Sequence, residues 1–206
     1  MMKSILLASA VVGSSAFAPS QQAKTNTALN AYQDELGAQA PIGFWDPLQM
    51  TKGASQERFD RLRYVELKHG RISMLAFLGQ ITTRAGIHLP GSIDASGHSF
   101  DSFPNGHAAI LGDNAIPIEG ICQIGIFIGY LELFVMKDSA NGAAPGEFPG
   151  DFRNGFLDFG WDKYSDETKL KKRAVELNNG RAAMMGILGL MVHEQLGSNM
   201  PIIGQL

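Results

Sequence analysis

Two stretches of this sequence are near copies of each other, Glu66-Leu-Lys-His-Gly-Arg-Ile-Ser-Met74 and Glu176-Leu-Asn-Asn-Gly-Arg-Ala-Ala-Met184, and they lie 110 positions apart. The likeness continues upstream, where Gly43-Phe-Trp-Asp46 matches Gly155-Phe-Leu-Asp158. Each half of the chain is therefore a Gly-Phe-x-Asp loop followed by a charged turn and then a helical segment. Internal repeats of this kind often indicate pseudo-twofold symmetry in membrane proteins.

The repeated stretches lie inside two long segments of helical periodicity, at about 56–85 and 167–196. Both begin with charged turns and then become apolar, so an averaged hydropathy window misses them. Between them, at 116–136, runs IPIEGICQIGIFIGYLELFVM, whose 21 residues include only two acids. At about 1.5 Å per residue, that run crosses a hydrocarbon core of about 30 Å. The sequence predicts an all-α membrane protein with three transmembrane helices, at about 56–85, 116–137 and 167–196. The first and third cross as a pseudo-twofold pair, and the middle one is unpaired.

The repeated charges predict how the first and third helices meet. Arg71 is turned about 140° around the helix from Glu66, so the two cannot easily neutralise each other. Because an unpaired charge in hydrocarbon is costly, each needs a partner elsewhere. The repeat supplies Arg181 for Glu66, and Arg71 for Glu176. Small residues that permit close approach of two helices recur in both copies: Gly70, Ala76, Gly79, Gly180, Gly186 and Gly189.

Ion pairs that hold the two helices together account for the arginines. They do not account for the second lone pairs of the carboxylates. His69 and Asn179 stand about one turn further along the same faces. Single oxygen and imidazole groups spaced along lipid-facing helices suit axial coordination of a hard ion whose other ligands come from elsewhere. The magnesium of a chlorophyll needs one such protein ligand, and its macrocycle would cover the helix. The pattern therefore indicates pigment binding.

The motifs ExxHGR in the first long helix and ExxNGR in the third resemble the signature of the light-harvesting chlorophyll-binding superfamily. Within it, four segments are similar to the fucoxanthin chlorophyll a/c proteins of diatoms and their relatives. That resemblance implies chlorophyll a, chlorophyll c and fucoxanthin as cofactors. The four segments are Leu36–Gln39, Arg58–Tyr64, Gly150–Asn154 and Met185–Gln195.

The resemblance also implies roles for individual residues. Arg71 and Arg181 would be the ion-pair partners, and Glu132 is a further candidate ligand. Hydrogen bonding between helices remains the alternative for Gln123 and Glu132, and an interfacial histidine is the alternative for His193. Axial ligands of chlorophyll magnesium are implied at Glu66, His69, Gln123, Glu176, Asn179 and His193.

The Asp46 and Asp158 loops resemble the segments that hold the polar ends of two central carotenoids in this superfamily. The aromatic side chains expected to pack against the polyene ends are Trp45, Phe44, Phe156 and Phe159.

Residues 1–30 have the composition of a targeting leader. A short apolar run after Lys3 is typical of a signal peptide, at about 1–16, and the acid-free, Ser/Thr-rich stretch at about 17–30 is typical of a transit peptide. Together they resemble the bipartite leader of algae with secondary plastids, and an ordinary secreted protein is the alternative. Residues 31–206 are then the mature domain, located in the thylakoid membrane. The basic runs Arg58–Arg63 and Lys169–Arg173 would face the stroma.

Composition argues against several other functions. Beyond Lys3 and Lys24, the chain carries 15 bases and 20 acids, so nothing suggests nucleic acid. Cys122 is the only cysteine, which excludes a disulfide framework and a thiolate zinc site. The chain has no Gly-x-Ser-x-Gly, phosphate loop or zinc spacing, so an enzyme is not expected. Three histidines between the first two helices match no metal pattern and are expected in a solvated loop: His88, His98 and His107.

The expected function is a light-harvesting antenna that absorbs light and transfers excitation to a photosystem. Its expected partners are pigments, thylakoid lipids, a photosystem core and other antenna subunits, in a homo- or hetero-oligomer. A photoprotective member of the superfamily that dissipates excitation is one alternative. An ion or proton transporter is another, because charges inside membranes often mark transport paths.

Overall fold

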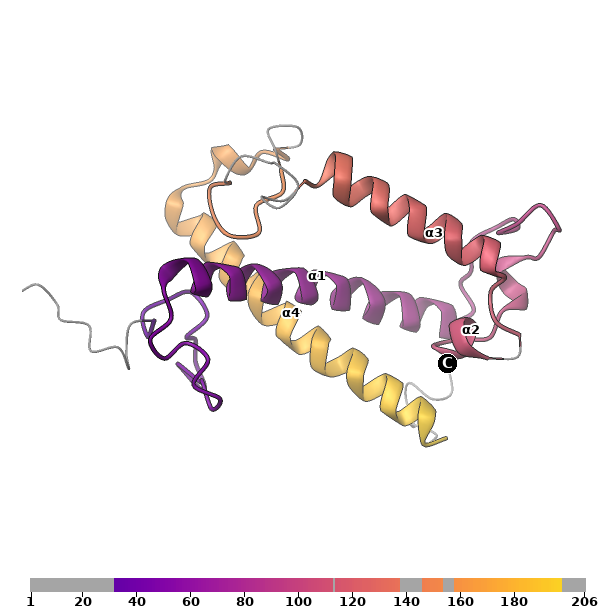
Figure 1. Cartoon of the computed structure of the whole chain (residues 1–206), viewed down its shortest axis with the longest axis horizontal. Helices are drawn as coiled ribbons and strands as arrows, with labels where there is room; N and C mark the ends of the chain where they lie inside the picture. The colour runs from indigo at the N-terminus through magenta and orange to yellow at the C-terminus, as the bar shows by residue number, and fades with distance from the viewer. Residues whose placement is uncertain (1–31, 113, 138–145, 154–157, 198–206) are drawn as a thin grey trace, which may run out of the picture.

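The computed structural model describes residues 32–112, 114–137, 146–153 and 158–197. The expected leader, residues 1–30, lies outside these ranges. The long helices are α1 (Gln56–Arg84), α3 (Ile118–Tyr130) and α4 (Asp166–Gln195), and Figure 1 shows their arrangement. The short elements are α2 (Ala108–Leu111), the π-helix η2 (Leu131–Val135) and the 3₁₀ turns η1 (Phe100–Ser102) and η4 (Trp161–Lys163).

Helices α1 and α4 begin and end in the same way. The side chains of Ser55 and Ser165 each accept a hydrogen bond from the backbone N–H three residues further on, at 3.3 and 3.4 Å. Acidic residues follow in both first turns, where they favour the positive end of the helix dipole. Shortly after each helix, Gly86 (φ 76°) and Gly197 (φ 62°) adopt a left-handed conformation that glycine accommodates without strain. Local sequence therefore sets the limits of both helices.

Helices α1 and α4 cross at the centre of the repeat (Figure 1). Gly70 and Gly180 meet there so closely that a Cβ placed on either would lie 2.9 Å from the other's Cα. Leu67 and Leu177, each three residues before its glycine, are buried beside the crossing. A glycine in each helix allows the two backbones to touch.

Helix α3 and the π-helix after it form the one stretch among the described residues that is long and apolar enough to span a membrane. This stretch is Ile118–Val135, with a mean hydropathy of 1.6, and only 6% of it is buried within the protein. An ion pair connects it to α1, with Lys68 Nζ lying 3.1 Å from Glu132 Oε1. The contact falls within the π-helical turn, a type of turn that often occurs at functional sites.

Different segments of the chain lie at the two ends of the molecule. Helices α1 and α4 start at the same end, where the segments 32–55, 146–153 and 158–163 lie, while the connection from α1 to α3 occupies the opposite end (Figure 1). The crossing lies between the two ends.

Candidate functional site

Two reciprocal ion pairs hold the α1–α4 crossing. Arg71 Nε donates to Glu176 Oε1 at 2.6 Å, and Arg181 Nε donates to Glu66 Oε1 at 2.7 Å. The predicted pairing of the repeated charges is confirmed. Each carboxylate thus meets a guanidinium from the other helix, and Glu66 also accepts from Arg63 Nη1 at 2.7 Å.

Each of these arginines also binds a loop that precedes one of the helices. Arg181 Nη1 donates to the carbonyl oxygen of Gly37, and Arg71 Nη1 donates to that of Gly150, both at 2.8 Å. A side chain at residue 37 would collide with the guanidinium groups, because a Cβ there would lie 2.8 Å from Arg181 Nη2. Neither carbonyl contact was predicted from the sequence, although a glycine ahead of each repeated helix was available as a signal.

A third carboxylate is also paired with a basic side chain from another helix. Glu132 on the π-helix is paired with Lys68 of α1, so a base from another helix neutralises it as well. Within the described residues, no donor contacts the second oxygen of Glu132 or of Glu176. Each can therefore offer an oxygen ligand without a net charge.

The geometry of His69 fixes its tautomer. Its Nδ1 lies 2.8 Å from the carbonyl oxygen of Val65 on the same helix. A carbonyl can only accept, so Nδ1 carries the proton and Nε2 keeps its lone pair. The side chain is exposed on the surface of α1. An imidazole held in this way could bind a metal ion through Nε2.

The other proposed ligands are placed as follows. Asn179 is exposed on α4 and Gln123 is exposed on α3. His193 is half-buried near the end of α4, and its buried Nδ1 has no hydrogen-bond partner among the described residues. The site residues are thus distributed along three helices and do not converge on one centre.

Asp46 and Asp158 act within their own loops. Asp46 accepts from the backbone N–H groups of Met50 and Thr51, at 3.0 and 2.8 Å, and from the Thr51 hydroxyl. The Thr51 hydroxyl, followed by its backbone N–H, lowers the pKa of the Asp46 carboxyl. Asp158 Oδ1 accepts from Arg153 at 3.1 Å. Both carboxylates therefore shape the loops.

The aromatic side chains of these loops are open to a ligand. Trp45 is 72% exposed and Phe159 is 88% exposed, whereas Phe44 is half-buried. Phe156, the fourth expected aromatic, lies outside the described residues.

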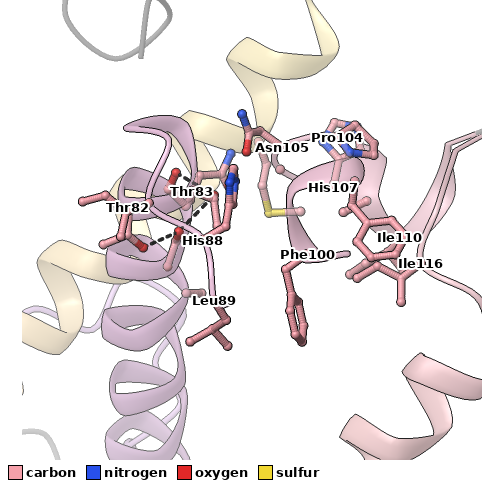
Figure 2. Close-up of a pocket in the computed structure, with 18 of the residues that line it drawn as sticks. Thr82, Thr83, His88, Leu89, Phe100, Pro104, Asn105, His107, Ile110 and Ile116 are labelled. Atoms are coloured by element: carbon pink, nitrogen blue, oxygen red, sulfur yellow. Dashed lines mark hydrogen bonds between the residues drawn. The ribbon is translucent and has the colours of Figure 1, made fainter. Parts of the chain in front are cut away.

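A cavity of about 710 Å³ lies at the opposite end, between α1, α4 and the connecting segment. Figure 2 shows Leu89, Phe100, Ile110 and Ile116 around this space, with His88 and His107 among the residues that line it. The lining is mainly apolar. It suits one end of an elongated apolar molecule better than a charged metabolite.

Glu194 links α4 to α1 and to the connecting segment at this end of the molecule. Its Oε2 accepts from Gln80 at 3.2 Å, from Arg84 at 3.4 Å and from the backbone N–H of His107 at 3.4 Å. The His107 Nδ1 atom lies 2.9 Å away. One carboxylate on α4 thus joins α1 to the connecting segment.

The expectation of a solvated loop is wrong for two of its histidines. The side chains of His88 and His107 are only 17% and 20% exposed, because the segment folds against the ends of α1 and α4. His98 is 53% exposed and pairs with Asp94, whose pKa it lowers by a side-chain hydrogen bond. Within the described residues, no group of three or more His, Cys, Asp or Glu side chains could hold a metal ion.

Large apolar side chains remain exposed around these ligand positions. Examples are Leu75 (72%) on α1, Ile126 (73%) on α3 and Met185 (72%) on α4. Apolar surface of this extent needs a covering. Flat apolar rings that carry their own metal, together with lipid, would cover the helices and use the single donors beside them, so the residues present fit such a group.

Comparison with known proteins identifies the relatives of this chain. A family model described as chlorophyll A-B binding protein matches residues 32–195. The fucoxanthin-chlorophyll a-c binding protein of Trieres chinensis is 66% identical over 204 residues, which cover 98% of this chain and 99% of the relative. Fucoxanthin-chlorophyll a-c binding protein A of Phaeodactylum tricornutum is 59% identical over 95% of this chain and 97% of its own length. Fucoxanthin-chlorophyll a-c binding protein B of Macrocystis pyrifera is 51% identical, covering 94% of this chain and 88% of its own length. All three are named as chloroplastic.

Proposed function

The chain belongs to the chlorophyll A-B binding protein family, and from that premise we propose that it is a light-harvesting antenna protein of a plastid thylakoid membrane. Its cofactors are chlorophyll a, chlorophyll c and fucoxanthin, as the names of relatives that match along their whole length indicate. It is a binding scaffold and makes or breaks no covalent bonds. When bound, the pigments supply light absorption and excitation transfer.

The proposal includes three membrane spans. Helix α3 with its π-helical turn supports one of them by length and composition. Helix α1 has 29 residues, a length of about 43 Å, which exceeds a hydrocarbon core and leaves its charged first turns in the headgroup region. Helix α4 has the same design over 30 residues. Both basic starts then face the stroma.

One observation carries the ligand assignment: carboxylates at the crossing are neutralised by arginines of the other helix. A neutral pair at a lipid-facing surface can present an oxygen to magnesium without leaving a bare charge in hydrocarbon. His69, with its lone pair on Nε2, offers the same chemistry through nitrogen. Gln123, Asn179, His193 and Glu132 are the further proposed ligands.

Carotenoids would extend from one end of the crossing to the other. The Asp46 and Asp158 loops lie at the end where α1 and α4 begin, with Trp45 and Phe159 exposed on them. The apolar cavity lies at the other end. A rod-shaped polyene lying along the α1–α4 crossing would meet aromatic side chains at one end and the apolar cavity at the other.

The remaining parts of the proposal concern targeting and assembly. Residues 1–30 act as the bipartite leader and are removed, so the mature chain starts near Ala31. Excitation then leaves for a photosystem core, directly or through other antenna subunits in an oligomer.

A histidine substitution tests the ligand assignment. We expect His69→Leu to yield a folded complex with one chlorophyll fewer per chain, measured by pigment extraction against protein concentration. His98→Leu is the matched control, because that exposed histidine pairs with Asp94 away from the helices and its loss should leave pigment content unchanged. Equal pigment content in the two variants would contradict the assignment.

A further inference from the structure

The two halves of the repeat differ at one contact. Glu66 and Glu176 each accept from the opposite helix on Oε1, at 2.7 and 2.6 Å, and their side chains are 27% and 29% exposed. Glu66 Oε2 also accepts from Arg63 Nη1 at 2.7 Å. Within the described residues, no donor reaches Oε2 of Glu176. The two carboxylates therefore differ in hydrogen bonding while matching in exposure.

The counterpart of Arg63 in the second half of the repeat makes a different contact. Arg173 is the repeat counterpart of Arg63, 110 positions later. Its guanidinium carbon lies 4.2 Å from the centre of the Phe148 ring, a distance typical of a close cation–π contact. The guanidinium carbon of Arg63 lies farther from a ring, 5.3 Å from the centre of Phe59. Phe148 belongs to the loop before α4, so this loop engages Arg173 where Arg63 engages its glutamate. The two halves of the repeat, although similar in sequence, therefore differ in the contacts of Arg63 and Arg173.

This asymmetry changes how each carboxylate can bind a metal. An N–H donated to a carboxylate stabilises its charged form and makes the oxygen less basic. Glu66 shares its charge with two guanidinium groups, whereas Glu176 shares its charge with one and keeps an oxygen open. Magnesium prefers hard, basic oxygen ligands. Arg63 is also only 10% exposed, so water screens its charge poorly.

We propose that Arg63 is a positioning residue that makes Glu66 the weaker of the two carboxylate ligands, so that chlorophyll at Glu66 dissociates before chlorophyll at Glu176. The inference rests on the proposed function, because it takes both carboxylates as magnesium ligands. The sequence repeat alone would make the two sites equal.

The test is the rate of chlorophyll release from the full pigment–protein complex in mild detergent at a fixed raised temperature, followed by absorption. We expect a fast phase in the unmodified complex, which Arg63→Gln slows about tenfold, the effect of removing one charge-assisted hydrogen bond from the ligand. Arg173→Gln is the matched control, because its guanidinium contacts a ring, and it should leave the fast phase unchanged. An unchanged or faster release in Arg63→Gln would overturn the proposal.

A second measurement keeps the native Arg63, in case its variant does not assemble. We expect Glu66→Gln to alter only the fast phase and Glu176→Gln to alter only a slower one. The reverse order, or an effect of both variants on the same phase, would overturn the proposal. A complex without chlorophyll would instead refute the proposed function, whereas a full pigment content with equal release from both sites would refute this inference alone.

Discussion

The contact of Gly70 with Gly180 offers the sharpest test of the packing. In Gly180→Ala, the new Cβ would lie 2.9 Å from the Gly70 Cα, whereas carbon atoms in contact prefer about 3.5–4.0 Å. The obstacle is backbone, so the helices must move apart by several tenths of an ångström or more. Overpacking of this kind costs about 1–3 kcal/mol.

Gly189→Ala is the matched control on the same helix, because a Cβ there meets nothing within 4 Å. Both substitutions gain the same helix propensity, about 0.5–1 kcal/mol, which cancels when the two variants are compared. At about 2–4 °C per kcal/mol, the Gly180→Ala complex should melt about 2–12 °C below the Gly189→Ala complex. The assay is thermal unfolding followed by circular dichroism. Equal melting temperatures would refute a close crossing at Gly70 and Gly180.

Three further outcomes are expected. Arg71→Leu should cost about 1.5–3 kcal/mol by removing the charge-assisted hydrogen bond to Glu176. The double variant with Glu176→Leu should lose less than the sum of the single changes, and additive melting shifts would contradict the pairing. Glu194→Gln should weaken the end of the crossing by about 1.5–3 kcal/mol, measured as faster proteolysis of the connecting segment, and an unchanged cleavage rate would count against this role. Arg153 lowers the pKa of Asp151 from 3.8 to about 2. Because the folded-state pKa is lower than the unfolded one, the Arg153–Asp151 interaction stabilises the fold fully at neutral pH and is lost only as the pH falls from about 4 towards 2. The near-ultraviolet circular dichroism signal should therefore stay constant down to about pH 5. A change in that signal between about pH 7 and 5 would contradict this account.

The helix crossing could be predicted from the sequence because helical periodicity fixes which side chains share a face. Glu66 and Arg71 cannot meet on one helix, and a repeated copy of both charges leaves reciprocal pairing as the simplest solution. Gly70 and Gly180 form that crossing, whereas the expected close approach is wrong for Gly79 and Gly189, where a Cβ would meet nothing within 4 Å. Local pattern and tertiary contact therefore agree at this site.

Contacts outside the repeated pair of helices could not be predicted in this way. Lys68 reaches Glu132 on a helix with no repeat counterpart, and no periodic pattern specifies that pair. The Gly37 carbonyl meets Arg181 because a loop folds back over the crossing. Such contacts depend on the path of the chain between elements, which residue spacing does not encode.

The fold of the segment between α1 and α3 could not be predicted from the sequence either. His107 and its neighbours look like a polar surface loop by composition, yet Glu194 draws the segment against α1 and α4. Hydrogen bonds between distant parts of the chain hold the half-buried His107 beside the cavity.

The central claim is that the protein harvests light, and the fluorescence-excitation spectrum of the complex purified from thylakoids in mild detergent tests it most directly. Chlorophyll a emission should be excited with high yield through chlorophyll c and carotenoid absorption bands. Bound pigment with strongly quenched emission in dilute, monodisperse sample would contradict harvesting and favour dissipation of excitation. A folded, colourless protein would contradict pigment binding altogether.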